Sequence, residues 1–541
     1  MKTHFYKSCY AIITSMLFSA CTKNFESLNT NPAGITEDVF KADFKQIILP
    51  LQNAQKAIQS SGSYQVQQNL NADIYSGFMM SPTPFNGGIN NTNYFMMDGW
   101  NTVILDVAYN NVLQVLSDYS KLTTTYEGVD FAFTNAMAKT IKVLALHRTS
   151  DIFGPVIYTK FGKANADLSV DYDSQKDAYM AFFADLDDAV SLLKPFTTGS
   201  KKVLAAFTKA DIIYGGNAVN WLKLVNTLRL RLAIRINNVD AATARIQGEK
   251  ALAPANGGLI TDNSANALLD FGMRHPISEI IGWDDIRIGA PLVSFLTGYN
   301  DPRLPHMAAR ATDPAVAGKY IGIRNGVAID DKSRYSGYSI PLAKAASGDY
   351  FDPKDGKAKL ASAAETYFLM AEAALNGWAN AGNEADNYNK GIAASFEEWA
   401  AGSSAGYAND NTSTAAPYVD PKAQVAGNND VPVKDSNLST ITIKWDDAAP
   451  PEQQLERIIT QKWIAIYPDG QEAWTEFRRT GYPKLFPVVV NNSGGLIKKF
   501  IRRLPIPGKY QSNNKPGYDR AVQTLNGPDN GETRLWWDSK K

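Results

Sequence analysis

The 541-residue chain is poor in cysteine, in net charge and in long apolar runs. Its only cysteines are Cys9 and Cys21, and 54 basic residues balance 54 acidic ones. A balanced charge gives no reason to propose nucleic acid as a partner, so we expect none. No stretch after residue 20 approaches 18 apolar residues, which excludes a membrane-spanning helix from this part of the sequence.

The N-terminus has the pattern of a lipoprotein export signal. Lys2 and Lys7 provide a positive start, residues 10–20 a short apolar core, and Ser19-Ala20-Cys21 a small-residue cleavage site. Once Cys9 leaves with the signal, Cys21 has no disulfide partner, and lipidation would make it an anchor. The sequence thus predicts a signal peptide over 1–20, a lipidated tether over 21–37 and lipid on Cys21, although a secreted protein with an incidental Cys21 stays open.

Signals of enzymatic chemistry are also scarce. His147, His275 and His306 lack the paired spacing of a zinc site, and no phosphate-binding glycine loop or G-x-S-x-G motif occurs. Neighbouring acids such as Asp187-Asp188, Asp330-Asp331 and Asp446-Asp447 could imitate a glycosidase pair, but sequence neighbours seldom face one another across a substrate. We therefore expect no enzyme, no cofactor and no metal site, although calcium held by loop carboxylates stays open.

Apolar residues recur every three or four positions in several long segments, which predicts a mainly α-helical fold. Asp469, followed by Glu472, has the pattern of a helix N-cap. Pairs of such helices indicate a tetratricopeptide-like stack, although no clean 34-residue repeat is visible. The expected helices lie over 38–60, 133–144, 221–236, 361–378, 384–401, 452–466 and 469–479.

Four long irregular tracts separate the helices. Loops of this length are uncommon in compact domains unless they bind something or are disordered. We read the Ala-, Ser-, Asn- and Asp-rich tract 402–450 as a decorative surface insertion in a single body spanning 38–541. The other three tracts, 81–93, 256–285 and 313–355, are the places where we expect a site.

Five segments now point to a family. They are 24–32 (NFESLNTNP), 211–235 (DIIYGGNAVNWLKLVNTLRLRLAIR), 301–304 (DPRL), 364–378 (AETYFLMAEAALNGW) and 461–481 (QKWIAIYPDGQEAWTEFRRTG). In this order they resemble the SusD/RagB family of outer-membrane nutrient-binding lipoproteins. The closing Trp536-Trp537-Asp538 is also similar to the end of that family's sequences.

The resemblance implies tetratricopeptide-like helix pairs that scaffold a loop-rich ligand-binding half. It also implies a cell-surface lid on a SusC-like TonB-dependent transporter that captures oligosaccharides, or in some members peptides, before import. Independently, a lipid-anchored protein without a membrane span needs a channel as partner to move a solute. A lipid-anchored glycoside hydrolase and a purely structural adaptor remain alternatives.

Aromatic residues of the irregular tracts are the candidate ligand contacts, because sugar rings stack on aromatic faces while side chains such as Asn, Asp and Arg bind the hydroxyls. Each ring could instead only pack its loop onto the body. By contrast, Trp221 belongs to an apolar helical stripe, and Arg229, Arg231 and Arg235 on the same helix are expected to be ion-paired or snorkelling. The candidates are Tyr94, Phe95 and Trp100, which resemble in position the family's aromatic cluster, with Trp283, Tyr335 and Tyr338, and the polar partners Asn101, Asp284 and Arg324.

Overall fold

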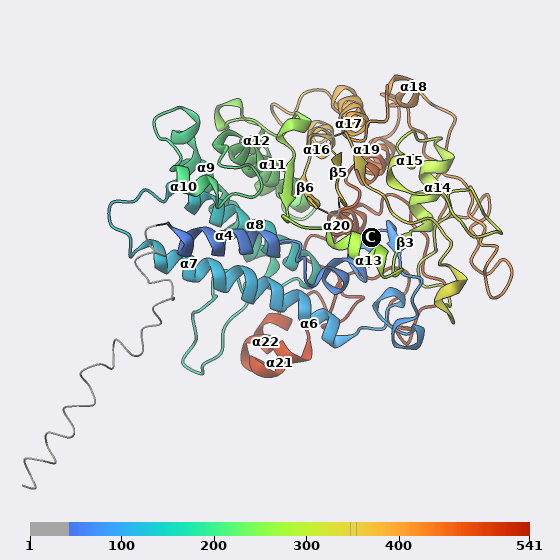
Figure 1. The fold of residues 1–541 in the computed structure, drawn as a ribbon, viewed down its shortest axis with the longest axis horizontal. Coiled ribbons are helices and arrows are strands. Elements are labelled where there is room, and N and C mark those ends of the chain that lie inside the picture. Colours follow the sequence, from blue (N-terminus) through green and yellow to red (C-terminus); the bar gives the residue numbers. More distant parts are fainter. Residues whose placement is uncertain (1–42, 347, 353, 541) are drawn as a thin grey trace, which may run out of the picture.

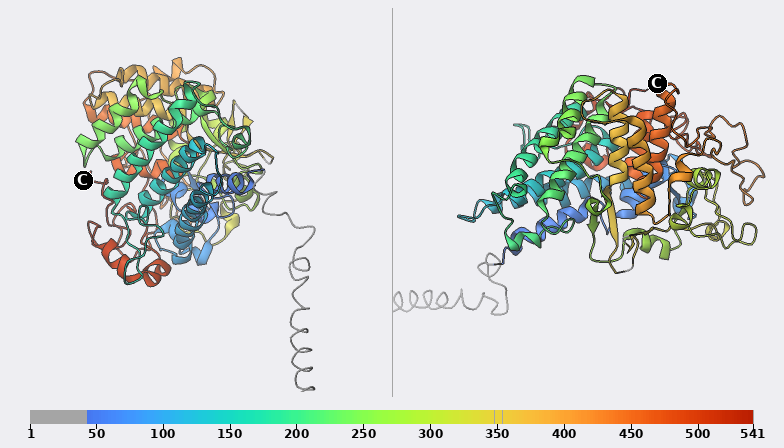
Figure 2. Two further views of the ribbon diagram at one scale, coloured as in Figure 1. Left: turned by 90° about the vertical axis from the view of Figure 1, so that its left-hand side faces the viewer. Right: turned by 90° about the horizontal axis from the view of Figure 1, so that it is seen from above.

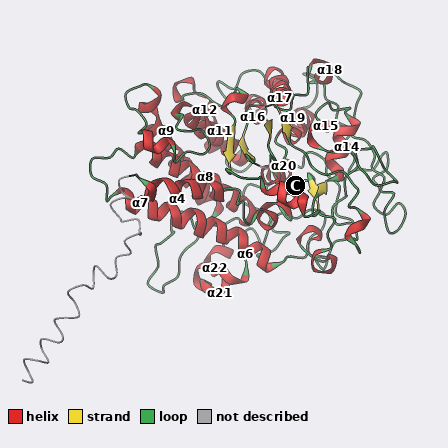
Figure 3. Cartoon of the chain, viewed as in Figure 1, coloured by secondary structure: helices red, strands yellow, loops and turns green. Residues whose placement is uncertain are grey.

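Helices dominate the computed structural model, which describes residues 43–346, 348–352 and 354–540. Figure 3 shows most long helices gathered in one part of the molecule and irregular loops at the other end. The predicted signal peptide, Cys21, the tether and the start of the first expected helix lie outside the described residues. No helix in the described part is long and apolar enough to cross a membrane.

Packed helix pairs form the scaffold, as predicted. In the first half of the chain α8 (Ala132–Phe153) packs on α9 (Gln175–Thr197), and α11 (Ala218–Ile236) packs on α9 and on α12 (Ala241–Leu252). In the second half α16 (Ala363–Leu375) packs on α17 (Glu384–Glu398) and α19 (Pro451–Ala465), which leads into α20 (Gly470–Thr480). The turned views in Figure 2 show these helices side by side.

Local chemistry explains where the helices begin and end. α8 stops at Gly154, whose φ of 87° is a left-handed conformation that glycine adopts readily. At the start of α20, Asp469 accepts a hydrogen bond from the backbone N–H of Glu472, at 3.3 Å, as its N-cap pattern predicted. Both termini therefore follow from residues next to the helix in sequence.

Shorter elements complete the described part of the body. There the strands form three two-stranded antiparallel pairs: β1 (Met79–Met80) with β3 (Arg287–Ile288), β2 (Ala267–Asp270) with β6 (Lys357–Ala361), and β4 (Lys344–Ala345) with β5 (Gly348–Asp349). The remaining α-helices among the described residues are α4 (Lys45–Ala57), α5 (Ala72–Tyr75), α6 (Asp98–Asp106), α7 (Val115–Thr123), α10 (Ala205–Thr208), α13 (Pro276–Gly282), α14 (Ala290–Gly298), α15 (Leu304–Met307), α18 (Ala405–Ala408), α21 (Gly508–Asn513) and α22 (Lys515–Val522). Two π-helices, η1 (Gln65–Asn69) and η4 (Val107–Gln114), and five 3₁₀ turns, η2 (Phe85–Gly88), η3 (Asn91–Asn93), η5 (Pro254–Asn256), η6 (Asn263–Ala265) and η7 (Lys332–Arg334), join them.

The β1–β3 pair brings two of the candidate tracts together. Met79 lies opposite Ile288 in this pair. The start of tract 81–93 therefore lies close to the end of tract 256–285. Gly289 is required at this crossing, because a Cβ there would lie 2.2 Å from the carbonyl oxygen of Gly77. A close backbone approach thus fixes the two tracts to each other.

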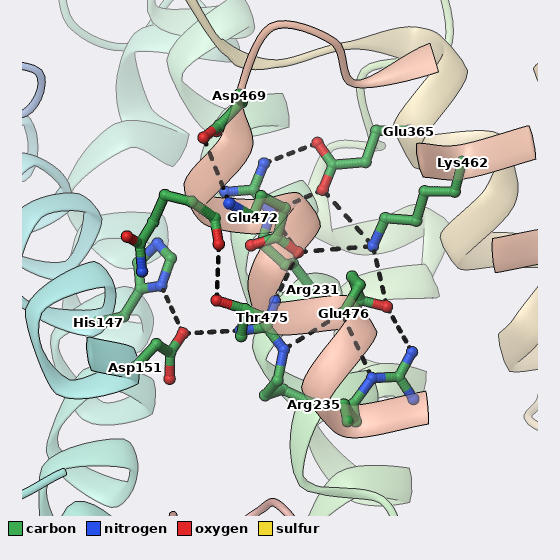
Figure 4. A network of polar contacts seen from close by, with 12 residues as sticks. His147, Asp151, Arg231, Arg235, Glu365, Lys462, Asp469, Glu472, Thr475 and Glu476 are labelled. Carbon is green, nitrogen blue, oxygen red and sulfur yellow. Dashed lines mark hydrogen bonds and ion pairs between the residues drawn. The ribbon is translucent and has the colours of Figure 1, made fainter. Parts of the chain in front are cut away.

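Charged residues fill part of the core (Figure 4). Arg235 is fully buried and contacts Asp151 at 2.7 Å, Glu472 at 2.5 Å and Glu476 at 3.2 Å. Arg231 contacts Glu365 at 2.7 Å. These pairs join α8, α11, α16 and α20, and removal of one partner would leave a buried charge uncompensated.

Two more cations belong to this network. Lys462 lies 3.6 Å from Glu476, and Arg479 lies 2.6 Å from both Glu372 and Glu476. Burial alone would raise the pKa of Glu476, but Arg479, Lys462 and Arg235 outweigh it and lower that pKa to about 2. Arg229, on the same helix as Arg231, pairs with Asp187 at 2.6 Å, so the ion pairing expected of the α11 arginines is confirmed.

Trp221 belongs to the core, as its helical stripe predicted. The ring is fully buried, and its indole N–H donates to Asp211 at 2.7 Å. The tract 402–450, in contrast, is more than a decoration. Its Tyr418 is buried and donates to the carbonyl of Gly322 at 2.9 Å, and Tyr407 packs on the buried Arg303. This tract therefore supports the loops against which it packs.

Candidate ligand-binding face

Asp285 connects the three tracts in which we expected a site from the sequence. Its carboxylate accepts hydrogen bonds from Thr83 at 2.5 Å, from Lys332 at 2.6 Å and from Gln65 at 3.2 Å. Thr83, Asp285 and Lys332 belong to 81–93, 256–285 and 313–355 respectively, and Gln65 begins η1. Tracts far apart in sequence thus form one continuous face.

Trp283 lies at the edge of a groove on this face. The groove, of about 500 Å³, separates residues 61–66 from α13, and Glu279 and Ile280 of α13 line it together with Trp283. The Trp283 side chain is 54 % exposed, and its backbone carbonyl accepts a hydrogen bond from Lys332 at 2.7 Å. An exposed indole beside a cleft of this size offers a stacking surface for a flat ligand.

A second aromatic group lies at and near α6, which contacts η1 as α13 does. Trp100, in the first turn of α6, is partly buried and meets the edge of Phe85 at a centroid distance of 5.9 Å. Phe95 is 43 % exposed. The helices that carry Trp100 and lead to Trp283 therefore both contact one π-helical turn, an element that is frequent at functional sites.

Four predicted ligand residues are enclosed instead of exposed. Tyr94 is buried against Tyr75, and Asn101 is buried and accepts a hydrogen bond from Asn91 at 2.9 Å. The hydroxyls of Tyr335 and Tyr338 both donate to Asp420, at 2.8 and 2.6 Å, with the rings fully packed. The three tyrosine rings are buried and offer no free face in this conformation. The Asn101 amide and the hydroxyls of Tyr335 and Tyr338 are used in contacts with other loop residues.

Two predicted polar partners likewise hold the backbone. Arg324 donates to the carbonyls of Asn429, Asp430 and Pro487 at 3.0–3.2 Å. Asp284 has a left-handed φ of 61° and forms an ion pair with the buried Arg287. Of the predicted set, Phe95, Trp100 and Trp283 therefore remain as ring faces that a ligand could reach.

Sequence reasoning missed the residues that position this face. No motif contains these residues, which are Gln65, Thr83, Asp285 and Lys332. The sequence indicated Thr83, Asp285 and Lys332 only by placing them in the irregular tracts. Their importance depends on contacts between residues up to 220 positions apart, which no local pattern encodes.

The acids and histidines considered for catalysis have other contacts. Asp187 pairs with Arg229 and Lys250, and Asp330 pairs with Arg334. His275 is buried, accepts a hydrogen bond from the N–H of Ile277 at 3.0 Å, and has its pKa lowered to about 3 by burial. Within the described residues no group of three His, Cys, Asp or Glu side chains could hold a metal ion.

Comparison with known proteins gives the same architecture. Residues 27–538 match the family model "SusD-like: Susd and RagB outer membrane lipoprotein". A chitin-binding SusD homologue from Flavobacterium johnsoniae is 39 % identical, with a TM-score of 0.82 over 93 % of this chain and 99 % of that one. A SusD homologue from Bacteroides vulgatus is 34 % identical, with a TM-score of 0.83 over the same shares of the two chains. No curated protein matches the sequence.

The structure thus has an α-helical scaffold whose loops and helix ends carry the aromatic residues Trp283, Trp100 and Phe95. The family match spans nearly the whole of this chain. The chain belongs to the SusD-like family of SusD and RagB outer membrane lipoproteins.

Proposed function

We propose that this protein captures oligosaccharides at the cell surface, on the face formed by Trp283, Trp100 and Phe95. The observation that carries the proposal is the exposed indole of Trp283 at the edge of a 500 Å³ groove. A side chain with this much apolar area in water has little structural purpose, whereas it would stack on a sugar ring. The groove volume falls within the range of small-ligand clefts.

Chitin fragments are the first ligand to test. The relative from Flavobacterium johnsoniae that is described as chitin-binding shares 39 % of its residues with this chain over nearly its whole length. The groove lining also contains one charged side chain, Glu279, which pairs with Arg274 at 3.2 Å. A lining with so little net charge suits a neutral sugar such as N-acetylglucosamine.

The protein would then pass its ligand to a SusC-like TonB-dependent transporter without breaking a bond. Lipid on Cys21 would hold it at the outer membrane. Family membership and the export-signal pattern support this arrangement.

Calorimetry with chitin hexasaccharide tests the proposal. We expect Trp283→Ala and Trp100→Ala each to weaken binding by about 1–3 kcal/mol with little change in melting temperature. Trp221→Ala is the matched control, because loss of its buried ring should cost about 3–5 kcal/mol of stability without a selective effect on affinity.

Three outcomes would contradict the proposal. New reducing ends after incubation with polysaccharides would make the protein a glycoside hydrolase, and binding of peptide pools alone would make it a peptide binder. Silence on every saccharide and peptide would favour a structural adaptor of the transporter.

A further inference from the structure

One further tryptophan lies outside the core and outside the proposed face. All ten tryptophans belong to the described part of the chain, and seven of them are buried. The other three are Trp100 and Trp283, which belong to the face proposed above, and Trp536. Trp536 is partly exposed, although its ring meets Tyr179 of α9 at a centroid distance of 6.0 Å. A large ring that the fold leaves partly in water is a candidate contact for a ligand.

Trp536 lines a hollow of about 520 Å³. Residues of the loop 526–534 and of the stretch 536–539 line it together with Leu496, and none of them lines the groove at Trp283. In Figure 1 the C-terminal end of the chain lies over α13, but the view from above in Figure 2 shows the two on opposite sides of the molecule. A ligand in this hollow would therefore not touch Trp283.

The loop 526–534 is held in place by contacts of its own. Asp529, which does not line the hollow, pairs with the fully buried Arg503 at 2.5 Å. The side-chain oxygen of Asn530 accepts a hydrogen bond from the backbone N–H of Glu532 at 3.0 Å, which closes a turn within the loop. The hollow is therefore formed before a ligand arrives, and binding would not require the loop to become ordered.

Several polar groups of the lining make no hydrogen bond within the described part of the chain. Arg534 uses only its Nη1, which donates to Asp538 at 2.7 Å and to the carbonyl of Lys540 at 2.6 Å. Asn530 uses only its side-chain oxygen, so its amide nitrogen is available. The other such groups are the indole N–H of Trp536, the side-chain amide of Asn526 and the hydroxyl of Ser539. The hollow thus offers donors and acceptors that no described side chain occupies.

The charged groups around the hollow cancel one another. Asp538 lies 2.7 Å from Arg534 and 3.4 Å from Arg502, and Glu532 is the other acid of the lining. Two guanidinium groups and two carboxylates leave no net charge to attract an ion. This lining is also unlike the core of a protein interface, which is depleted of charged side chains. A ring beside amide and hydroxyl groups instead suits an uncharged saccharide, which has apolar C–H faces and many hydroxyls.

We infer that this hollow is a second saccharide-binding site, in which a neutral sugar stacks on Trp536 and forms hydrogen bonds with Asn526 and Arg534. The site lies on the opposite side of the molecule from Trp283 and does not depend on the face proposed above. A polymer long enough to reach both sites would be held at two points, and its affinity would exceed that of either site alone.

Calorimetry on the full chain tests this site with chitin hexasaccharide, cellohexaose and maltohexaose, which are neutral, and with a pool of peptides. Trp536→Ala is the main variant. Trp283→Ala is the matched control, because it removes the indole that lines the other groove. Asn526→Ala is a second variant at an exposed position, where the lost side chain makes no hydrogen bond in the described part of the chain.

We expect at least one neutral saccharide to bind at a site that Trp536→Ala weakens by about tenfold or more and that Trp283→Ala leaves unchanged. This result would stand even if Trp283→Ala had no effect on any ligand, an outcome that would reject the proposed face but not this site. The inference would be overturned if no saccharide binding depended on Trp536, if both variants caused equal losses at a single site, or if only peptide binding depended on Trp536. If Trp536→Ala unfolds, unchanged affinity for all three saccharides in Asn526→Ala would also overturn it.

Discussion

Asp285→Asn should detach the loops of the aromatic face while the scaffold stays folded. Asparagine has nearly the same size as aspartate but keeps one acceptor oxygen and adds an N–H₂ group, so it cannot accept from Thr83, Lys332 and Gln65 together. Thr83 and Lys332 share one carboxylate oxygen, so the substitution removes the hydrogen bond from Gln65 and the charge that strengthens the one from Lys332, a loss of about 1–3 kcal/mol in buried sites. Since Lys332 is one-third exposed, we take about 2 kcal/mol for this partly wet cluster.

A change of about 2 kcal/mol is roughly a 30-fold change in the equilibrium between docked and released loops. Affinity for chitin hexasaccharide should therefore fall by up to about 30-fold, and backbone amides of 81–93 and 330–335 should exchange hydrogen faster. Melting temperature should fall by only a few degrees, because the helix pairs do not contain Asp285.

Asp331→Asn is the matched control. It removes the same charge from the neighbouring turn, and asparagine can keep the hydrogen bond that Asp331 accepts from the N–H of Ser333 at 2.7 Å as the N-cap of η7. Wild-type affinity and amide exchange in Asp285→Asn, or an equal loss in Asp331→Asn, would refute the role given to Asp285.

Three further predictions concern the scaffold and the anchor. Arg235→Met should lower the unfolding free energy by about 3–5 kcal/mol, measured by urea denaturation, because it leaves buried carboxylates unpaired; a change below about 1 kcal/mol would place the network in water. Burial raises the pKa of Asp73 to about 7 from an ordinary 3.8, so its contribution to stability is fully present below pH 3.8 and is lost as pH rises towards 7; Asp73→Asn should remove this pH dependence, and unchanged melting curves between pH 4 and 8 would refute it. Cys21→Ser should move the protein from the membrane to the soluble fraction, and full membrane retention in cells lacking the transporter would contradict lipidation at Cys21.

Sequence patterns predicted the helical scaffold well, because its determinants are local. The stripe that contains Trp221 and the N-cap Asp469 each depend on residues within one or two turns of their helix. The tetratricopeptide-like pairing then follows from apolar faces that must be covered.

The binding face was predicted only in outline, because its determinants are distant in sequence. Tyr335 and Tyr338 look like free loop aromatics until Asp420, more than 80 positions later, takes both hydroxyls. Asp285 resembled any loop acid, and only the fold brings Gln65, Thr83 and Lys332 to it. Loop aromatics thus indicate where a site lies, whereas long-range polar contacts decide which rings remain free.

The buried charge network also sets a condition on the order in which the chain can become native. Asp151 lies early in the sequence, but its partner Arg235 also pairs with Glu472 and Glu476, which lie near the other end of the chain. The indole N–H of Trp537, still later in the sequence, donates to Asp151 at 2.8 Å. A growing or truncated chain that ends before residue 472 holds Arg235 without two of its three carboxylates, so that arginine must stay in water and the helices around it cannot close. We therefore expect the native state to form only when nearly the full length of the chain is present, and unfinished chains to remain accessible to proteases.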